Sequence, residues 1–157
     1  MNTFYYLSIW LHIICASFWI GGMLFLPLVL LPAIKNNPER RQILMITGLK
    51  FRFYGYITIA LLLLTGITNM YFRGIHFTWI FFTNSNYGKL VIVKGILFLI
   101  ILLASMIHDM FVGRKAVGEI QESDRDKLKL IARWTGRILL LISLTMAYLG
   151  VIISRGG

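Results

Sequence analysis

The stretch LHIICASFWIGG, Leu11–Gly22, decides the fold because it places a histidine inside an apolar segment long enough to cross a membrane. No charged residue interrupts that segment between Phe4 and Ile34, and about 20 apolar residues are enough for a spanning helix. An ionisable group in hydrocarbon is costly, so such residues usually face the protein interior and have a function. We therefore expect a membrane protein in which His12 turns inward.

The composition of the whole chain supports this interpretation. Of its 157 residues, 58% are hydrophobic and 14% are charged, whereas about a quarter are charged in a typical soluble domain. The net charge of +10 does not indicate a nucleic-acid partner, because the basic residues lie between apolar runs, as the positive-inside rule requires. The single cysteine, Cys15, excludes an internal disulfide and any CxxC metal site.

Four apolar segments qualify as spans, at about residues 4–34, 53–72, 90–107 and 138–154. The first is longer than a bilayer needs and carries Pro27 and Pro32 near its end, so we expect it to tilt, kink or protrude. It is also too long for the apolar region of a signal peptide, so we expect it to be retained. The fold class predicted is all-α integral membrane, a single transmembrane domain over residues 1–157 arranged as an antiparallel four-helix bundle.

The basic residues predict the orientation of this bundle. Twelve of them lie in the predicted inner loops, residues 35–52 and 108–137: Lys35, Arg40, Arg41, Lys50, Arg52, Arg114, Lys115, Arg125, Lys127, Lys129, Arg133 and Arg137. The other side has three: Arg73, Lys89 and Arg155. Both termini should therefore lie outside (N-out/C-out), in the inner membrane of a bacterium. The predicted outer loop, residues 73–89, is aromatic and suits a short helix on the membrane surface.

Each span has one face of polar or small residues, repeated in helical steps of three and four. Such faces usually mark contacts between membrane helices, so they predict a polar seam in the bundle. The four sets are Ser8, His12, Cys15, Trp19 and Gly22; Thr58, Thr65 and Asn69; Lys94, Phe98, Ile101, Ser105 and His108; and Gly136, Ser143, Ala147 and Gly150.

Depth in the membrane separates two candidate sites. At 1.5 Å of rise per residue, His12 lies roughly 10 Å and Lys94 roughly 8 Å below the outer side, so the two can share a site. We expect Trp19 to form a wall of that site and Gly21 and Gly22 to let a neighbouring helix approach. His108 lies roughly 28 Å down, so His12 and His108 should not ligate the same haem or copper. Whether His76 joins the outer site is open.

The second candidate site lies at the inner ends of the spans. Arg52, Arg133 and Arg137 begin their spans near His108 and Asp109, and arginine suits planar contacts with carboxylates. They could hold a haem propionate, a phosphate or a lipid head group. The alternative is that these residues only satisfy the charge rule for inner helix ends.

The chain resembles the copper-resistance D (CopD) family and, more distantly, protoporphyrinogen oxidases of the HemJ type. The resemblance covers nearly the whole chain and rests on LHIICASFWIGGMLF, FRFYGYITIALLLLTG, GKLVIVKGILFLIILLASMIHD and GRILLLISLTMAYLGVIISRG. It implies that His12, Trp19, Gly22, Arg52, Lys94 and His108 matter, for copper uptake or tolerance in the first family and for haem b binding and porphyrinogen oxidation in the second. Full copper-resistance D proteins are commonly longer than this core unit, and a homodimer would restore a larger bundle.

Three functions remain open. The first is binding or movement of copper by His12 and Cys15, since copper(I) favours sulfur and imidazole. His108, at a different depth, is a separate candidate metal ligand. The second is a haem b redox protein, or a membrane oxidoreductase if it is an enzyme, with His12 or His108 as axial ligand. The third is an accessory or assembly subunit of a larger membrane complex, in which the histidines are structural.

Overall fold

The structure is a computed structural model that describes residues 3–75, 78–116 and 125–155, although the side chains of residues 108–116, 125–129 and 132 lie outside that description. Over these ranges the chain is helical and contains no strand. It divides into two compact units, Met1–His76 and Phe77–Gly157, which are described separately below.

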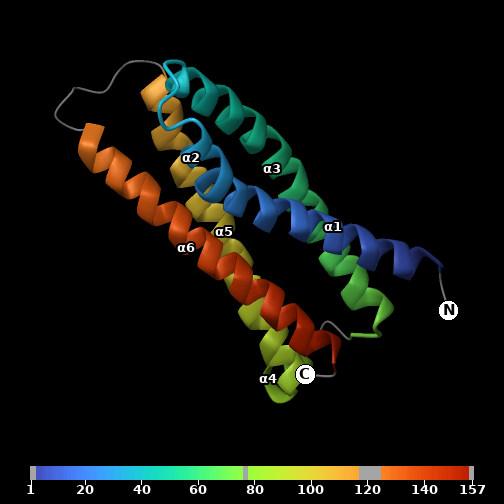
Figure 1. Ribbon diagram of the computed structural model, residues 1–157. Coiled ribbons are helices and arrows are strands. Elements are labelled where there is room, and N and C mark those ends of the chain that lie inside the picture. The colour runs from blue at the N-terminus through green and yellow to red at the C-terminus, as the bar shows by residue number, and fades with distance from the viewer. Residues whose placement is uncertain (1–2, 76–77, 117–124, 156–157) are drawn as a thin grey trace. The chain divides into compact units, whose positions relative to one another are not determined.

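The first unit is a helical hairpin with an irregular first arm. It contains α1 (Thr3–Phe25), a π-helical segment η1 (Leu26–Leu30), α2 (Leu31–Ala33) and α3 (Arg40–Phe72), and α1 packs against α3 (Figure 1). Pro27 lies within the π segment and has no N–H to donate to the preceding turn. The helix widens there, and the N–H of Leu31 donates to the carbonyl of Leu26, five residues back. The expected irregularity of the first span is therefore a local change of winding.

The second arm, α3, is longer than the span that the sequence predicted. It begins at Arg40, within the basic segment that we expected to be a loop, and continues to Phe72 without interruption. Neither glycine nor proline stands at its start, and Arg, Gln and Leu favour helix. Its 33 residues extend about 50 Å, whereas a bilayer core is about 30 Å thick.

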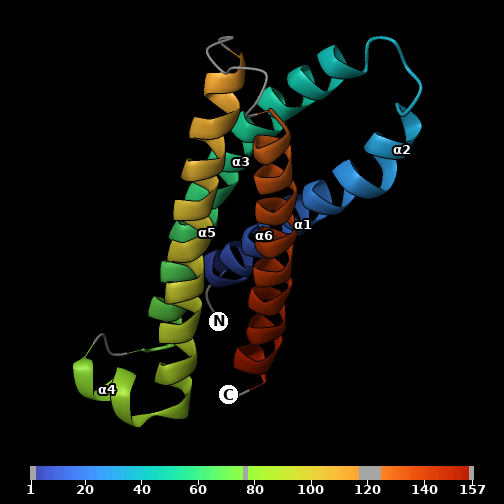
Figure 2. The same ribbon diagram turned by 90° about the vertical axis from the view of Figure 1, so that its left-hand side faces the viewer.

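The second unit contains α4 (Trp79–Asn84), α5 (Asn86–Ala116) and α6 (Arg125–Ser154). Both views show α5 and α6 side by side (Figures 1 and 2), and the two helices are in contact. The short helix expected in residues 73–89 is present as α4, which begins where the hydroxyl of Thr78 accepts from the N–H of Phe81. Gly88 is required at the α4–α5 corner, because a side chain there would collide with the backbone of Phe81 and Phe82.

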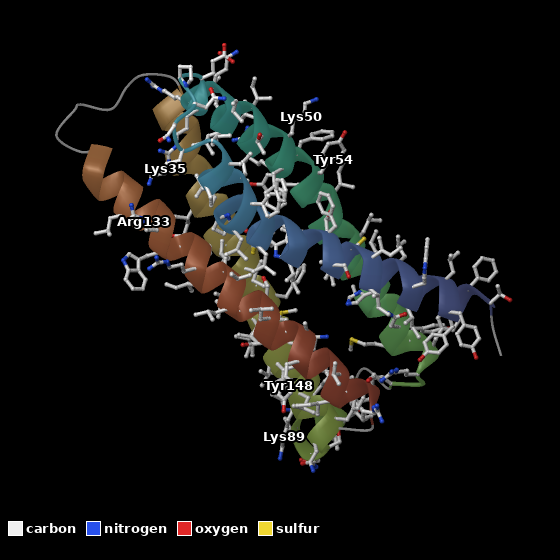
Figure 3. All side chains as sticks on the ribbon, in the orientation of Figure 1. Lys35, Lys50, Tyr54, Lys89, Arg133 and Tyr148 are labelled. Atoms are coloured by element: carbon white, nitrogen blue, oxygen red, sulfur yellow. The ribbon has the colours of Figure 1, made fainter. Side chains whose placement is uncertain are left out.

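Among the residues that the structure describes, four helices are long and apolar enough to cross a membrane: Thr3–Ala33, Arg40–Phe72, Asn86–Ile107 and Arg133–Ser154. Large apolar side chains such as Leu64, Leu103 and Leu141 are exposed along them. Figure 3 shows side chains that project from the helices and labels the exposed Tyr54 and Tyr148 among them. Lateral apolar surface on this scale is what a lipid-facing helix presents, whereas a soluble protein rarely exposes it. The described residues are all-helical apart from short connections, and their four long apolar helices indicate a membrane protein.

Candidate functional site

His12 is fixed by a hydrogen bond to α3 in the first unit. Its Nδ1 lies 2.7 Å from Oγ1 of Thr65. The Thr65 hydroxyl also lies 2.6 Å from the carbonyl of Leu61 in its own helix and donates to it. With its single proton used there, the hydroxyl oxygen accepts from His12 when the imidazole is in the tautomer that carries its proton on Nδ1, and Nε2 then carries the lone pair.

Ser8 makes a second link between α1 and α3, one helical turn before His12. Its hydroxyl donates to the backbone carbonyl of Thr65 at 3.4 Å, so one residue of α3 accepts from both side chains. Ser8 and Thr65 are buried and His12 is half-buried. Gly66 faces the imidazole, where an added methyl group would meet Cε1 of His12 at an ordinary 3.7 Å. The histidine thus sits in a polar contact between the two helices.

Cys15 and Trp19 continue the same face of α1 on the other side of His12, and both are buried. The indole of Trp19 stacks on the ring of Phe51, with centroids 6.1 Å apart and planes 25° apart. Gly55 accommodates the indole, since a methyl group at position 55 would lie 3.1 Å from Cζ3 of Trp19. The buried Trp19 is therefore half of an aromatic pair, and its role as a wall of a site stays a prediction.

Gly22 and Gly21 differ, although the same role was expected of both. A methyl group at Gly22 would collide with the ring of Phe51, so Gly22 permits the close approach as expected. Gly21 is exposed and has nothing within 4 Å of that position, so the expectation is wrong for it. The sequence reasoning missed Phe51 and Gly55. The small residue Gly55, three before Thr58 on the predicted polar face, was the available signal.

The other end of the α1–α3 contact, beyond Ser8, is polar as well. Oδ1 of Asn69 is buried without a hydrogen-bond partner. One turn further along α3, Nε of Arg73 donates to the hydroxyl of Tyr5 at 3.1 Å, and the Tyr5 ring packs on Phe72. Thr65, Asn69 and Arg73 are thus successive polar positions leading from His12 to the end of the unit.

Lys94 belongs to the second unit, on the face of α5 that the sequence predicted to turn inward. It is half-buried, and its Nζ lies 3.5 Å from the point where a methyl group at Gly150 of α6 would stand. Ile101 and Ser143 are buried on the two helices, whereas Gly136 and Ala147 are exposed, so the predicted small-residue face of α6 is only partly correct. The sharing of one site by His12 and Lys94 stays a prediction.

The predicted inner cluster also stays a prediction. Arg52 is half-buried in the first unit, whereas Arg133 and Arg137 are exposed on α6. The Arg137 guanidinium lies 5.4 Å from the ring centroid of Trp134. The side chains of His108 and Asp109, together with all of His76, lie outside the described residues.

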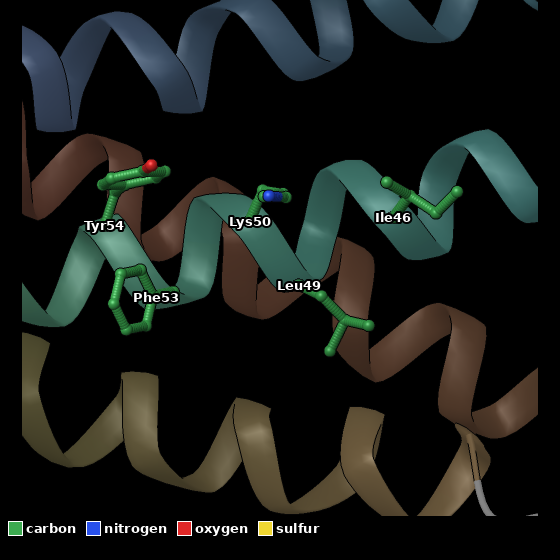
Figure 4. A pocket seen from close by; sticks show the side chains of 5 residues that line it. All are labelled: Ile46, Leu49, Lys50, Phe53 and Tyr54. Atoms are coloured by element: carbon green, nitrogen blue, oxygen red, sulfur yellow. The ribbon is translucent and has the colours of Figure 1, made fainter.

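A hollow of about 320 Å³ lies on the first part of α3 and is open to its surroundings (Figure 4). Its lining is mostly apolar and includes none of the predicted site residues: Ile46, Leu49, Lys50, Phe53 and Tyr54. Within the part of the chain that the structure describes, no group of three or more His, Cys, Asp and Glu side chains is placed to hold a metal ion. His12 and Cys15 supply an imidazole and a thiol on the polar face of α1.

Comparison with known proteins places the chain among its relatives. No family model matches it, and no solved structure does. A protein of Aquifex aeolicus (strain VF5), described as uncharacterized, is 32% identical over 152 residues, which cover 96% of this chain and 95% of that protein. At this identity, over nearly the full length of both, the chain belongs to the same family as the Aquifex aeolicus protein.

Proposed function

We propose that this chain is a multi-pass protein of the bacterial inner membrane that binds copper(I) through His12 and Cys15. The observation that carries the proposal is the His12–Thr65 hydrogen bond. Histidines that bind metals almost always donate their other ring N–H to an oxygen, which fixes the tautomer and makes the ligating nitrogen more basic. In this proposal Thr65 has that role, and Nε2 is the nitrogen that binds the metal.

Cys15 is the second ligand in this proposal. It follows His12 by three residues on the same face of α1, a spacing that brings Cβ atoms to within about 5–6 Å. A thiolate with an imidazole favours copper(I) over harder ions. A site with few protein ligands suits an ion that is handed on, so we propose copper transfer, as the resemblance to the copper-resistance D family implies.

The arrangement in the membrane is part of the proposal. We infer an antiparallel four-helix bundle with both termini outside, because the basic residues concentrate on the other side. His12 then lies in the outer half of the membrane, where Lys94 falls at a similar depth, and a homodimer would supply further helices.

Metal analysis and absorption spectra of the purified protein test the proposal. We would reconstitute it with copper(I) under reducing conditions and compare the wild type with His12→Ala and Cys15→Ser. Thr68→Val is the matched control, because the Thr68 hydroxyl bonds the Leu64 carbonyl of its own helix. Stoichiometric copper is expected in the wild type and the control, and little in the two site variants.

Other outcomes of these measurements would overturn the proposal. A Soret band with a b-type α-band after dithionite reduction would assign haem, for which the His12 tautomer also suits an axial ligand. A colourless, metal-free protein whose His12→Ala variant remains functional in cells would assign the accessory-subunit role.

A further inference from the structure

We infer that a narrow water path leads to His12 from the end of the first unit that carries Tyr5 and Arg73, and that Asn69 holds its water. The inference rests on the proposed site at His12 but not on copper. The ligand class is water, with the protons that water carries.

The buried amide oxygen of Asn69 is the first observation. This Oδ1 has no hydrogen-bond partner. Leaving a buried acceptor unsatisfied lowers the stability of a protein by about 1–3 kcal/mol. Ser105 in the second unit also has a buried oxygen without a partner, but a serine hydroxyl can rotate and donate to a carbonyl of its own helix. An amide oxygen only accepts, so Asn69 needs a donor from outside its helix, and a buried water is the usual one.

The arrangement of the neighbouring polar groups is the second observation. His12 and Thr65 form one layer of the α1–α3 contact, and Ser8 and Asn69 lie about one turn, or roughly 6 Å, beyond it on their helices. The Tyr5–Arg73 hydrogen bond lies at the end of the same contact. Water bound at Asn69 would therefore stand between the histidine layer and the end of the unit.

The outward faces of the same helices have the opposite character. Leu7 is exposed over 55% of its surface and Leu64 over 61%, whereas Ser8 is exposed over 8%. The polar groups thus follow the helix contact, and the apolar groups lie on the exposed sides of the two helices. Water at the depth of Ser8 has to travel along the contact, because the lipid-facing side offers no polar partners.

Cysteine accessibility tests the path, and Cys15→Ala provides a background without cysteine. In that background we would compare Ser8→Cys with Leu7→Cys, using a small cationic methanethiosulfonate reagent. The two positions are neighbours at the same depth, but one faces the contact and the other the lipid. Since the reagent attacks thiolates, which need water, we expect the buried Cys at position 8 to react about tenfold faster or more.

A second substitution tests the role of Asn69. Adding Asn69→Leu to the Ser8→Cys protein should lower its reaction rate about tenfold, whereas Asn69→Asp should largely retain it, because a carboxylate also binds water. Thr68→Leu, at the adjacent position, is the control and should leave the rate unchanged. In sealed vesicles the reagent should act only from the side on which the N-terminus lies.

Three results would overturn the inference: position 8 reacting no faster than position 7, Asn69→Leu leaving the rate of position 8 unchanged, or labelling only from the opposite side. A native elution profile in detergent and an unchanged helical circular dichroism spectrum exclude misfolding as the cause. Labelling of position 8 in the Cys15→Ala background, together with a wild type that binds no copper, would refute the copper proposal alone. Copper binding by a wild type whose Ser8→Cys variant is unreactive would refute the path alone.

Discussion

Thr65 is the residue on which the geometry of His12 depends, and a valine tests it. Thr65→Val keeps the shape but removes the acceptor, which leaves the Nδ1 proton of His12 buried without a partner. We expect the free energy of unfolding to fall by about 1–3 kcal/mol and the affinity for copper to fall about 10- to 100-fold. Denaturant titration in micelles and competition with a copper(I) chelator measure the two changes.

The control for Thr65→Val is Thr68→Val, which removes a hydroxyl that bonds the preceding turn of its own helix, α3. Thr68→Val should change the free energy of unfolding and the affinity for copper little. Thr65→Ser should retain most of the stability and affinity that Thr65→Val loses. Equal affinities in Thr65→Val and Thr68→Val would show that Thr65 does not set the histidine tautomer.

The adjacent glycines Gly21 and Gly22 provide a second paired experiment. A methyl group at position 22 meets the Phe51 ring, which is held by its stack on Trp19, so Gly22→Ala should lower the free energy of unfolding by about 1–3 kcal/mol. Gly21→Ala meets nothing and replaces glycine inside a helix, so it should be neutral or stabilise by up to about 1 kcal/mol. Equal effects on unfolding in micelles would contradict the packing described for α1 and α3.

At the scale of the helices, the sequence identified which face of a helix is buried better than it identified which residues on the neighbouring helix that face contacts. The steps of three and four on α1 correctly predicted that Ser8, Cys15 and Trp19 are buried. They did not predict that Thr65, rather than Thr58, would meet His12. Periodicity along one helix fixes which side turns inward, but the pairing depends on how far two helices slide along each other. Bulky contacts such as Trp19 on Gly55 set that register, and they appear only in three dimensions.

The π segment η1 shows a similar limit. Pro27 predicted an irregularity, but the loss of one N–H can be met by a kink or by a wider turn, and the sequence does not distinguish them. Pro27→Ala restores the missing donor, so we expect a continuous α-helix. The N–H of Leu31 should then donate to residue 27 instead of Leu26.

The Pro27→Ala change should also rotate the chain beyond the segment by about 100°, since one residue leaves the widened turn. Ile34, which is buried, should lose its position and the unit should become less stable. Backbone NMR shifts of residues 26–31 report the winding, with Pro32→Ala as a control that should retain the Leu31–Leu26 bond. Unchanged shifts in Pro27→Ala would mean that packing, not proline, maintains the π turn.

At the scale of the whole molecule, the length of α3 and the positions of its basic residues together indicate which part of this helix extends beyond the bilayer core. The helix exceeds the bilayer core by about 20 Å. Arg40, Arg41, Lys50 and Arg52 all lie in its first half, so that half is the part that suits the aqueous or head-group region. The sequence predicted the side of the membrane for these charges but not their helical conformation, because a polar helical segment and a polar loop have similar compositions.

The orientation that follows from these charges can be tested with reporter fusions. An alkaline phosphatase joined after Arg155 should be active, because it is active only outside the inner membrane, and green fluorescent protein at the same point should be dark. Fusions after Lys35 should show the opposite pattern, which makes them the matched control. The physical reason for this expectation is that twelve basic residues lie on the predicted inner side and three on the outer side. The reverse result would leave the His12–Thr65 contact intact but turn the end that carries Tyr5 and Arg73 toward the cytoplasm. His12 would then receive its water, and any copper that follows the same path, from the cytoplasmic side.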